Sequence, residues 1–245
     1  MYQERTYRQS HSPDLTGFQI QYEACDLWIA ISPSTYTDSL PQQCLHFIRQ
    51  LWQELYTYID TDTEFARTLS PYTPADSAPH SAEQMAIASR QAGVGPMAAV
   101  AGYFAQALGE YLIELMSPAD LIIENGGDIW LRSSQSRTIA LHAGQSPFSG
   151  KIALDIPATK SLSICTSSGT VGHSLSFGRA DAVTVLATDA SLADAFATAI
   201  ANRILDPSDI TRELNELPTV ILGCVIILGE HIGAKGAIKI VALTN

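Results

Sequence analysis

The chain has 245 residues, of which 46% are hydrophobic and 16% are charged. This composition is too apolar for a disordered chain, and it supplies enough nonpolar surface for a sizeable core. There are 14 Lys and Arg residues against 25 Asp and Glu residues, which gives a net charge of −11. A surface this acidic argues against nucleic acids and anionic membranes as partners.

Targeting and cysteine patterns favour a cytoplasmic protein. Residues 1–8 carry charges with no apolar stretch behind them, so a secretion signal is not expected. The longest apolar run, residues 219–229, is about half of the roughly 20 residues that a bilayer span needs, and it predicts a buried strand. The cysteines lie far apart and have no metal-ligand spacing, which indicates reduced thiols and no structural zinc site. They are Cys25, Cys44, Cys165 and Cys224.

The first part of the chain predicts a strand pair followed by helices. Residues 18–31 begin with alternating apolar and polar side chains, as a strand or hairpin does. In residues 41–59, apolar residues recur every three or four positions, which is typical of an amphipathic helix. Residues 68–81 are rich in proline, serine and threonine and predict a loop, and residues 82–92 predict a short helix.

The segment from Pro96 to Leu115 is the most regular in the chain and predicts a helix. Pro96 suits the first helical turn, where its missing N–H costs nothing. A face of small residues follows the helical spacing: Ala98, Gly102, Ala105 and Gly109. Such a face lets another backbone approach closely, so we expect this helix in the molecular interior.

Beyond residue 120 the pattern changes to short strands. They are expected at residues 121–123, 129–131, 138–142, 151–156, 182–187, 220–228 and 237–243. One helix is expected between them, from Ser191 to Leu205. Because strands and helices do not alternate one for one, the pattern favours an α+β fold with mainly antiparallel strands.

Residues 124–128, Glu-Asn-Gly-Gly-Asp, form the first candidate site. Gly126 and Gly127 permit positive φ and a close ligand, and their N–H groups could form an anion-binding concavity. Asn-Gly is also a strong hairpin signal, and from the pattern by itself a plain hairpin turn is favoured.

Residues 165–174, Cys-Thr-Ser-Ser-Gly-Thr-Val-Gly-His-Ser, form the second candidate site. Hydroxyl groups and free N–H groups in a glycine-rich loop suit phosphate oxygens, although these side chains could equally satisfy their own turns. The spacing is neither that of a P-loop nor that of a nucleophile elbow. His173 could be a general base or a structural residue, and Cys165 could be a nucleophile or a buried core residue.

The predicted helix around residues 193–202 carries the third candidate site. Asp194, Thr198 and Asn202 are four residues apart and therefore share one face of an otherwise apolar helix. A carboxylate, a hydroxyl and an amide in this setting favour a polar partner such as Mg²⁺ with substrate phosphates. The alternative makes Ser191 the N-cap and Asp194 a capping-box acid, which leaves the other two side chains unexplained.

Together these stretches resemble the short cytoplasmic proteins of the ApbE-like superfamily, whose better-known members are FAD:protein FMN transferases. The matching segments are residues 93–102, 123–128, 164–177, 178–187 and 192–202. The resemblance covers nearly the whole chain. It implies a single α+β domain over residues 1–245, of T-fold-related architecture, with mainly antiparallel sheets and central helices.

The resemblance to the transferases also implies roles for individual residues. The turn that helps to hold the flavin nucleotide matches Asn125, Gly126, Gly127 and Asp128. The loop that borders the pyrophosphate matches Thr166, Ser167, Ser168 and Gly169. The Mg²⁺ ligands match Asp194 and Thr198, and the histidine after the loop matches His173, which would assist proton transfer.

Two departures from the transferases bear on activity. Their central-helix Lys-Gly-Tyr is Ala-Gly-Tyr at residues 101–103, and their Asp-Pro-x-Thr-Gly segment is replaced by residues 174–178. We expect binding of FAD or a related nucleotide with Mg²⁺, in a homo-oligomer, with FMN transfer to an acceptor protein as one hypothesis. The alternatives are a sulfur-handling accessory protein in amino-acid (homocysteine) biosynthesis, with Cys165 carrying persulfide, and a non-catalytic flavin-binding homodimer.

Overall fold

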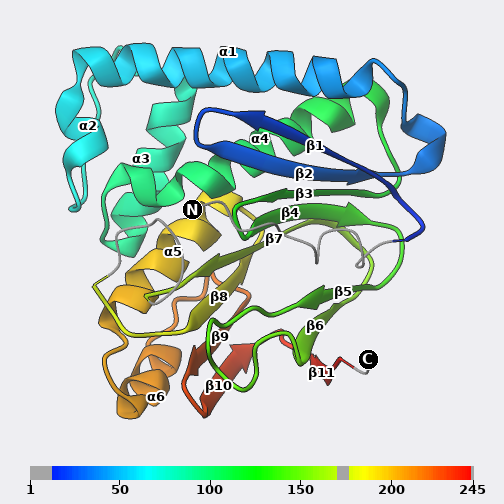
Figure 1. Ribbon diagram of the computed structural model, residues 1–245. Coiled ribbons are helices and arrows are strands. Elements are labelled where there is room, and N and C mark those ends of the chain that lie inside the picture. The colour runs from blue at the N-terminus through cyan, green and yellow to red at the C-terminus, as the bar shows by residue number, and fades with distance from the viewer. Residues whose placement is uncertain (1–12, 170–176, 244–245) are drawn as a thin grey trace.

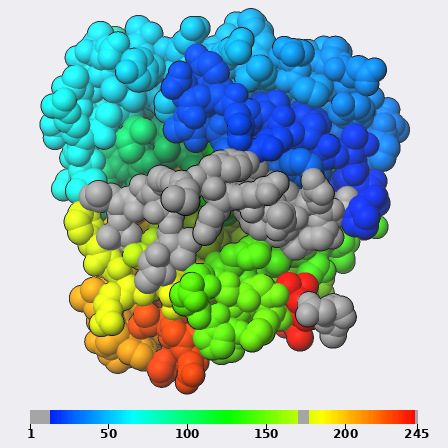
Figure 2. All heavy atoms as spheres, in the orientation of Figure 1, coloured from blue at the N-terminus to red at the C-terminus, as the bar shows by residue number. Residues whose placement is uncertain are grey.

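The computed structural model describes residues 13–169 and 177–243. Over these residues the strands form a sheet of eight and a smaller sheet of three, and helices cover one face of the larger sheet (Figure 1). In the space-filling view, residues 40–67 lie at the top of the molecule and residues 207–242 lie in its lower half (Figure 2). No helix within the described ranges has the length and apolar character that crossing a membrane requires.

The larger sheet joins strands from all parts of the chain. In spatial order its strands are β1 (Thr16–Tyr22), β2 (Cys25–Ile31), β3 (Leu121–Asn125), β4 (Asp128–Ser133), β7 (Thr159–Ser167), β8 (Ala182–Ala187), β9 (Gly223–Leu228) and β10 (His231–Gly236). The smaller sheet has the order β11 (Ile240–Ala242), β6 (Ile152–Ile156) and β5 (Arg137–Ala140). All these strand pairs are antiparallel, so the predicted α+β class with mainly antiparallel strands is confirmed.

The helices form a layer on the larger sheet. They are α1 (Leu40–Thr61), α2 (Thr63–Arg67), α3 (His80–Ala92), α4 (Val100–Met116), α5 (Ala190–Arg203) and α6 (Pro207–Asn215). Short 3₁₀ turns cover Pro33–Thr35 and Pro96–Ala99. Helices α4 and α5 pack directly on the central strands, and α1 lies across α3, α4 and β1 (Figure 1).

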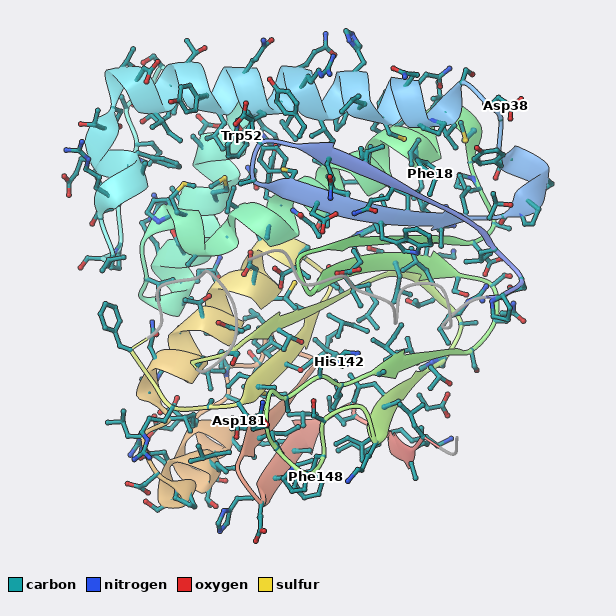
Figure 3. All side chains as sticks on the ribbon, viewed as in Figure 1. Phe18, Asp38, Trp52, His142, Phe148 and Asp181 are labelled. Atoms are coloured by element: carbon teal, nitrogen blue, oxygen red, sulfur yellow. The ribbon has the colours of Figure 1, made fainter. Side chains whose placement is uncertain are left out.

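Apolar cores lie on both faces of the larger sheet. Successive strand residues point to opposite faces, so Ile123 of β3 belongs to the core under the helices and Ile122 to the core between the sheets. On the helix side, Trp52 reaches from α1 toward α4, and its ring centroid lies 5.5 Å from that of Phe104 (Figure 3).

Two glycines of α4 allow the close packing that the small-residue face predicts. A Cβ added to Gly102 would lie 2.2 Å from the carbonyl oxygen of Ala190 at the start of α5. A Cβ added to Gly109 would lie 2.3 Å from the ring of Trp130 on β4. The expectation of an interior helix is therefore confirmed, since α4 lies against both a helix and the sheet.

Several elements differ from the prediction. The helix expected from Pro96 begins as a 3₁₀ turn, and α4 starts at Val100. The sequence patterns do not predict β7, β10 or α6. The hydroxyl-rich stretch after residue 164 suggests a loop, yet Thr166 and Ser167 belong to β7 and pair with β8. Helix α6 begins with a capping box that Asp206 and Asp209 form, a signal present in the sequence.

Candidate functional site

The β3–β4 hairpin places the first motif at one end of the larger sheet. Asn125 pairs with Asp128, and the two residues between them, Gly126 and Gly127, have φ of 73° and 115°. Both positive φ values are typical of a two-residue hairpin turn, so the hairpin interpretation of this motif is correct. The turn also anchors other elements, because Asn125 Nδ2 donates to Ala101 O at 3.1 Å at the start of α4.

Asp128 connects the hairpin to β7. Its Oδ1 accepts a hydrogen bond from the backbone N–H of Thr166 at 3.2 Å. The hydroxyl of Thr166 in turn lies 2.9 Å from that of Thr184 on β8. Asp128 is buried, as is Asp194 across from it on α5. The first and third motifs therefore meet through these two carboxylates.

Asp194 caps a helix other than its own. Its Oδ2 accepts from the N–H of Gly102 at 2.9 Å, and the N–H of Ala101 donates to the same carboxylate. These N–H groups lie in the first turn of α4 and have no intrahelical acceptor. The N-cap of α5 itself is Asp189, which accepts from Leu192 N at 2.8 Å. The alternative that made Ser191 the cap and Asp194 its capping-box partner is therefore wrong.

Each of the helices α4 and α5 supplies a hydrogen-bond acceptor for a free N–H group in the first turn of the other. The N–H of Ala190, the first residue of α5, donates to Gln106 Oε1 of α4 at 2.7 Å. In the other direction, the carboxylate of Asp194 on α5 accepts a hydrogen bond from the N–H of Gly102 in the first turn of α4. This reciprocal arrangement fixes the position of Asp194 relative to the hairpin.

Burial and charge both act on the carboxylate pair. Burial raises the pKa of Asp194 well above its usual value, and the nearby charge of Asp128 raises it further, while the N–H groups of Gly102 and Ala101 act in the opposite direction. Within the described chain no lysine, arginine or histidine forms an ion pair with Asp194. A proton or a cation shared at this place would therefore relieve the repulsion.

The polar face of α5 continues from Asp194 toward residues 177–180. Thr198 is half-buried one turn further along, and Asn202 another turn beyond it accepts from Phe177 N at 2.9 Å through Oδ1. Because Asn202 binds backbone there, the face borders the chain that follows the second motif. His173, the expected catalytic base, lies outside the described residues.

Ser167, Ser168 and Gly169, the described residues that follow Thr166 in the second motif, make contacts within the chain. Ser167 pairs with Val183 in the sheet. Ser168 Oγ and Gly169 N both donate to Ala180 O, at 3.4 Å and 2.8 Å. Of the groups expected to meet a phosphate, the Ser168 hydroxyl and the Gly169 N–H therefore bind the backbone just before β8.

Cys165 lies behind the carboxylate pair. Its Sγ donates to Ala190 O at 3.5 Å, and the side chain is fully buried. Burial raises the pKa of this thiol well above its usual value, and the charges of Asp128 and Asp194 add to the effect. The thiol is therefore held protonated, which is the unreactive form of cysteine. The other cysteines are buried and free of disulfides as well.

The carboxylate pair suits Mg²⁺ better than a transition metal. Over residues 13–169 and 177–243 there is no group of three or more His, Cys, Asp or Glu side chains that could hold a metal ion. Mg²⁺ is commonly held by one or two carboxylates, with water and substrate phosphates completing its shell. Asp128 and Asp194 would supply the carboxylates, and Thr198, on the same face of α5 as Asp194, would supply a hydroxyl. The residues thus fit Mg²⁺ together with a phosphorylated ligand.

Sequence reasoning did not foresee the backbone groups of this site. Ala101 and Gly102 contribute N–H groups and a carbonyl, whereas the sequence indicates only a small residue at position 102 and a departure from the transferases at position 101. The regular spacing of small residues on α4 indicates that another segment packs closely against this helix. It does not indicate that the segment is α5, or that Asp194 binds the N–H of Gly102.

The sheet and helix arrangement is that of the ApbE flavin transferases. The chain superimposes on the apo form of flavinyl transferase ApbE from Pseudomonas stutzeri with a TM-score of 0.59, over 90% of this chain and 93% of that one, at 13% identity. The superposition on a mutant of flavin transferase ApbE from Vibrio cholerae has a TM-score of 0.58, over 90% of this chain and 96% of that one, also at 13% identity. These likenesses define the class as an ApbE-like fold.

Sequence relatives narrow this class to a family. Residues 8–217 match the family described as AbpE bacteria. The chain is 46% identical over 187 residues to a UPF0280 protein of Methanosphaerula palustris, covering 76% of this chain and 78% of that protein. It is 42% identical over 200 residues to a UPF0280 protein of Methanothermobacter thermautotrophicus, covering 78% and 77%. The protein belongs to the AbpE bacteria family, and the expected membership of an ApbE-like family is confirmed.

Proposed function

We propose that the protein binds FAD, or a closely related flavin nucleotide, together with Mg²⁺ between the β3–β4 hairpin, β7 and α5. The observation that carries this proposal is the buried pair of Asp128 and Asp194, two carboxylates that influence each other's charge and converge from different elements. The ApbE-like fold supports the choice of ligand, because the solved structures that share it are described as flavin transferases.

The chain's own residues have separable tasks in this proposal. Asn125 ties the hairpin to α4 and keeps Asp128 in place, while Gly102 and Ala101 orient the carboxylate of Asp194. Mg²⁺, when bound, would neutralise charge on the nucleotide's pyrophosphate. Asp194 must lose its proton before it can act as a metal ligand, so binding should release a proton.

FMN transfer is the reaction we propose for the bound nucleotide. The hydroxyl of an acceptor protein would attack the FMN phosphorus of FAD, the bond to the bridging oxygen would break, and AMP would leave. His173, assigned by the family resemblance, would take the proton of the attacking hydroxyl. The fold similarity to flavin transferases supports this reaction class.

Titration of the full chain with FAD, followed by flavin fluorescence with and without Mg²⁺, tests the binding step. Wild-type protein should bind FAD more tightly with Mg²⁺, and Asp194→Asn should lose that metal dependence. Asp155→Asn is the matched control, because its carboxylate lies on β6 and pairs with Lys239. If wild-type protein fails to bind FAD in either metal state, the proposal is refuted.

Chromatographic detection of AMP tests the transfer step separately. Incubation with FAD, Mg²⁺ and a lysate supplying acceptor proteins should release AMP and leave covalent flavin on a protein band. FAD binding without either product would overturn the transfer reaction and favour the non-catalytic flavin-binding alternative.

A further inference from the structure

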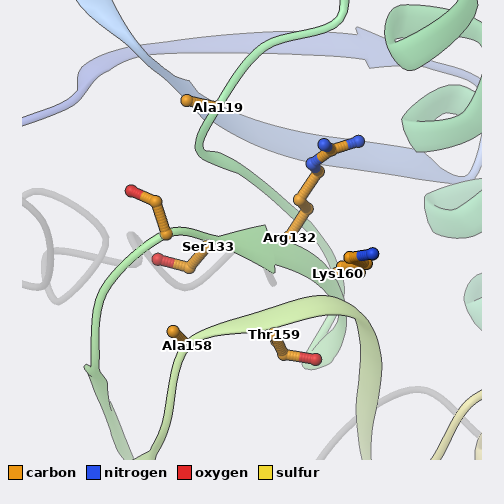
Figure 4. Close-up of a pocket in the computed structure, with 7 residues that line it drawn as sticks. Ala119, Arg132, Ser133, Ala158, Thr159 and Lys160 are labelled. Carbon is orange, nitrogen blue, oxygen red and sulfur yellow. The ribbon is translucent and has the colours of Figure 1, made fainter.

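A hollow bordered by two basic side chains lies at the opposite end of β4 and β7 from the carboxylate pair (Figure 4). Its volume is about 250 Å³, and its lining consists of Ala119, Arg132, Ser133, Ser134, Ala158, Thr159 and Lys160. Asp128 begins β4 and Ser133 ends it, so about 17 Å of strand separates the two places at ~3.4 Å per residue. The hollow is therefore distinct from the proposed flavin site.

A β-bulge brings two basic residues together at this hollow. Leu131 pairs with Leu162 and Ser133 with Thr159, so one residue of β4 lies opposite two residues of β7. The single residue is Arg132, and the two that oppose it include Lys160. A bulge interrupts the regular alternation of side chains and redirects one of them. Both basic side chains consequently line the same hollow.

Neither cation has a counter-ion within residues 13–169 and 177–243. No hydrogen bond or ion pair joins Arg132 or Lys160 to another residue of the described chain. Arg137 nearby is different, because it binds the carboxylates of Asp14 and Asp120. Like charges on opposed strand positions repel each other, and a bound anion would remove that repulsion.

The serine residues that line this hollow donate hydrogen bonds to the buried carboxylate of Asp120. Asp120 accepts hydrogen bonds from Ser133 Oγ at 2.7 Å, from the N–H and hydroxyl of Ser134 at 2.9 Å and 2.8 Å, and from Arg137 Nη2 at 3.0 Å. These contacts stabilise the negative charge of Asp120, and they engage the hydroxyl groups of Ser133 and Ser134. The two basic side chains remain as the groups that face a ligand.

We propose that this hollow binds the phosphate group of a small phosphate monoester. The guanidinium of Arg132 can donate two parallel hydrogen bonds to phosphate oxygens, and the ammonium of Lys160 adds a compact second charge. At ~30 Å³ per water molecule, the hollow has room for about eight waters. It therefore accommodates a phosphate group with part of the molecule that carries it.

Calorimetric titration of the full chain with inorganic phosphate at low ionic strength tests this site. Arg132→Gln and Lys160→Gln should each weaken phosphate binding by roughly tenfold or more, because each removes a charge-assisted contact. Lys151→Gln is the matched control, since it removes an exposed charge that does not line the hollow and should leave binding unchanged. Thermal melts of all three variants verify that they remain folded.

The outcomes separate the sources of the anion and do not depend on FAD or Mg²⁺. Tighter binding of glycerol 3-phosphate than of a phosphoserine tripeptide supports a small-molecule ligand, and the reverse order overturns it. Acetate binding as strong as phosphate binding, no phosphate binding by the wild-type chain, or equal losses in Lys151→Gln would each refute the phosphate site.

Discussion

Replacing Gly102 by alanine tests whether the contact between α4 and α5 holds the carboxylate site together. The new Cβ would lie 2.2 Å from the carbonyl oxygen of Ala190 and 2.9 Å from Cβ of Asp194, so the helices must separate. Overpacking costs about 1–3 kcal/mol, and weakening the bond from the Gly102 N–H to the protonated carboxyl group of Asp194 costs about 0.5–1.5 kcal/mol. Alanine's better helix propensity offsets about 1 kcal/mol. The net loss of stability is then about 0.5–3.5 kcal/mol.

Gly109→Ala provides the matched control on the same helix. Its Cβ would meet the ring of Trp130 at 2.3 Å, but the bond between Gly102 and Asp194 would stay intact. The expected loss is about 0–2 kcal/mol, from overpacking less the propensity gain. Urea unfolding followed by circular dichroism measures the stability of both variants, and FAD titration with Mg²⁺ measures their binding.

Gly102→Ala should lose both stability and metal-dependent FAD affinity, whereas Gly109→Ala should lose only stability. The reasoning fails if Gly102→Ala is as stable as the wild-type chain. It also fails if the folded forms of the two variants lose FAD affinity to the same extent, because the carboxylate contact would then have no special part in the site.

The pH dependence of stability should carry two opposite signatures. Burial and the Asp128 charge raise the pKa of Asp194, so the ligand-free protein should lose stability as the pH rises from about 4 through that raised value. Asp194→Asn should remove this slope in thermal melts, and an unchanged slope would contradict the assignment. For Asp120, burial by itself would raise the pKa, but hydrogen bonds from Ser133, Ser134 and Arg137 bring it to about 2. Its contribution, about 2 kcal/mol at neutral pH, is present above pH ~4 and is lost as the pH falls through about 2. In acid unfolding followed by circular dichroism, Asp120→Asn should reduce the loss of stability between about pH 4 and pH 2. If the variant loses stability over this range as steeply as the wild-type chain, groups other than Asp120 cause the loss.

Local signals in the sequence predict much of this fold. The glycines at positions 126 and 127 identify the hairpin, because few other residues adopt two consecutive positive φ values. The spacing of small residues on α4 predicts an interior helix. Strand β7 is not predicted, because its hydroxyl side chains resemble a loop until their partners on β8 are known.

The partners of the candidate site residues depend on contacts distant in sequence. Asp194 binds the N–H of a residue 92 positions earlier, so no local pattern distinguishes this contact from an ordinary capping box. The placement of Arg132 and Lys160 at one hollow depends on a shift of strand register that composition does not reveal. Residue types along the chain therefore indicate which side chains are available, and the tertiary fold decides which of them meet.

The mutual capping of α4 and α5 has a consequence for evolution of the family. Each helix depends on an acceptor that the other supplies, through Gln106 in one direction and Asp194 in the other. Substitutions at these two positions should therefore be non-additive, because the first loss already loosens the interface that the second would disturb. A substitution at Gln106 or at Asp194 therefore changes which residues are tolerated at the other position.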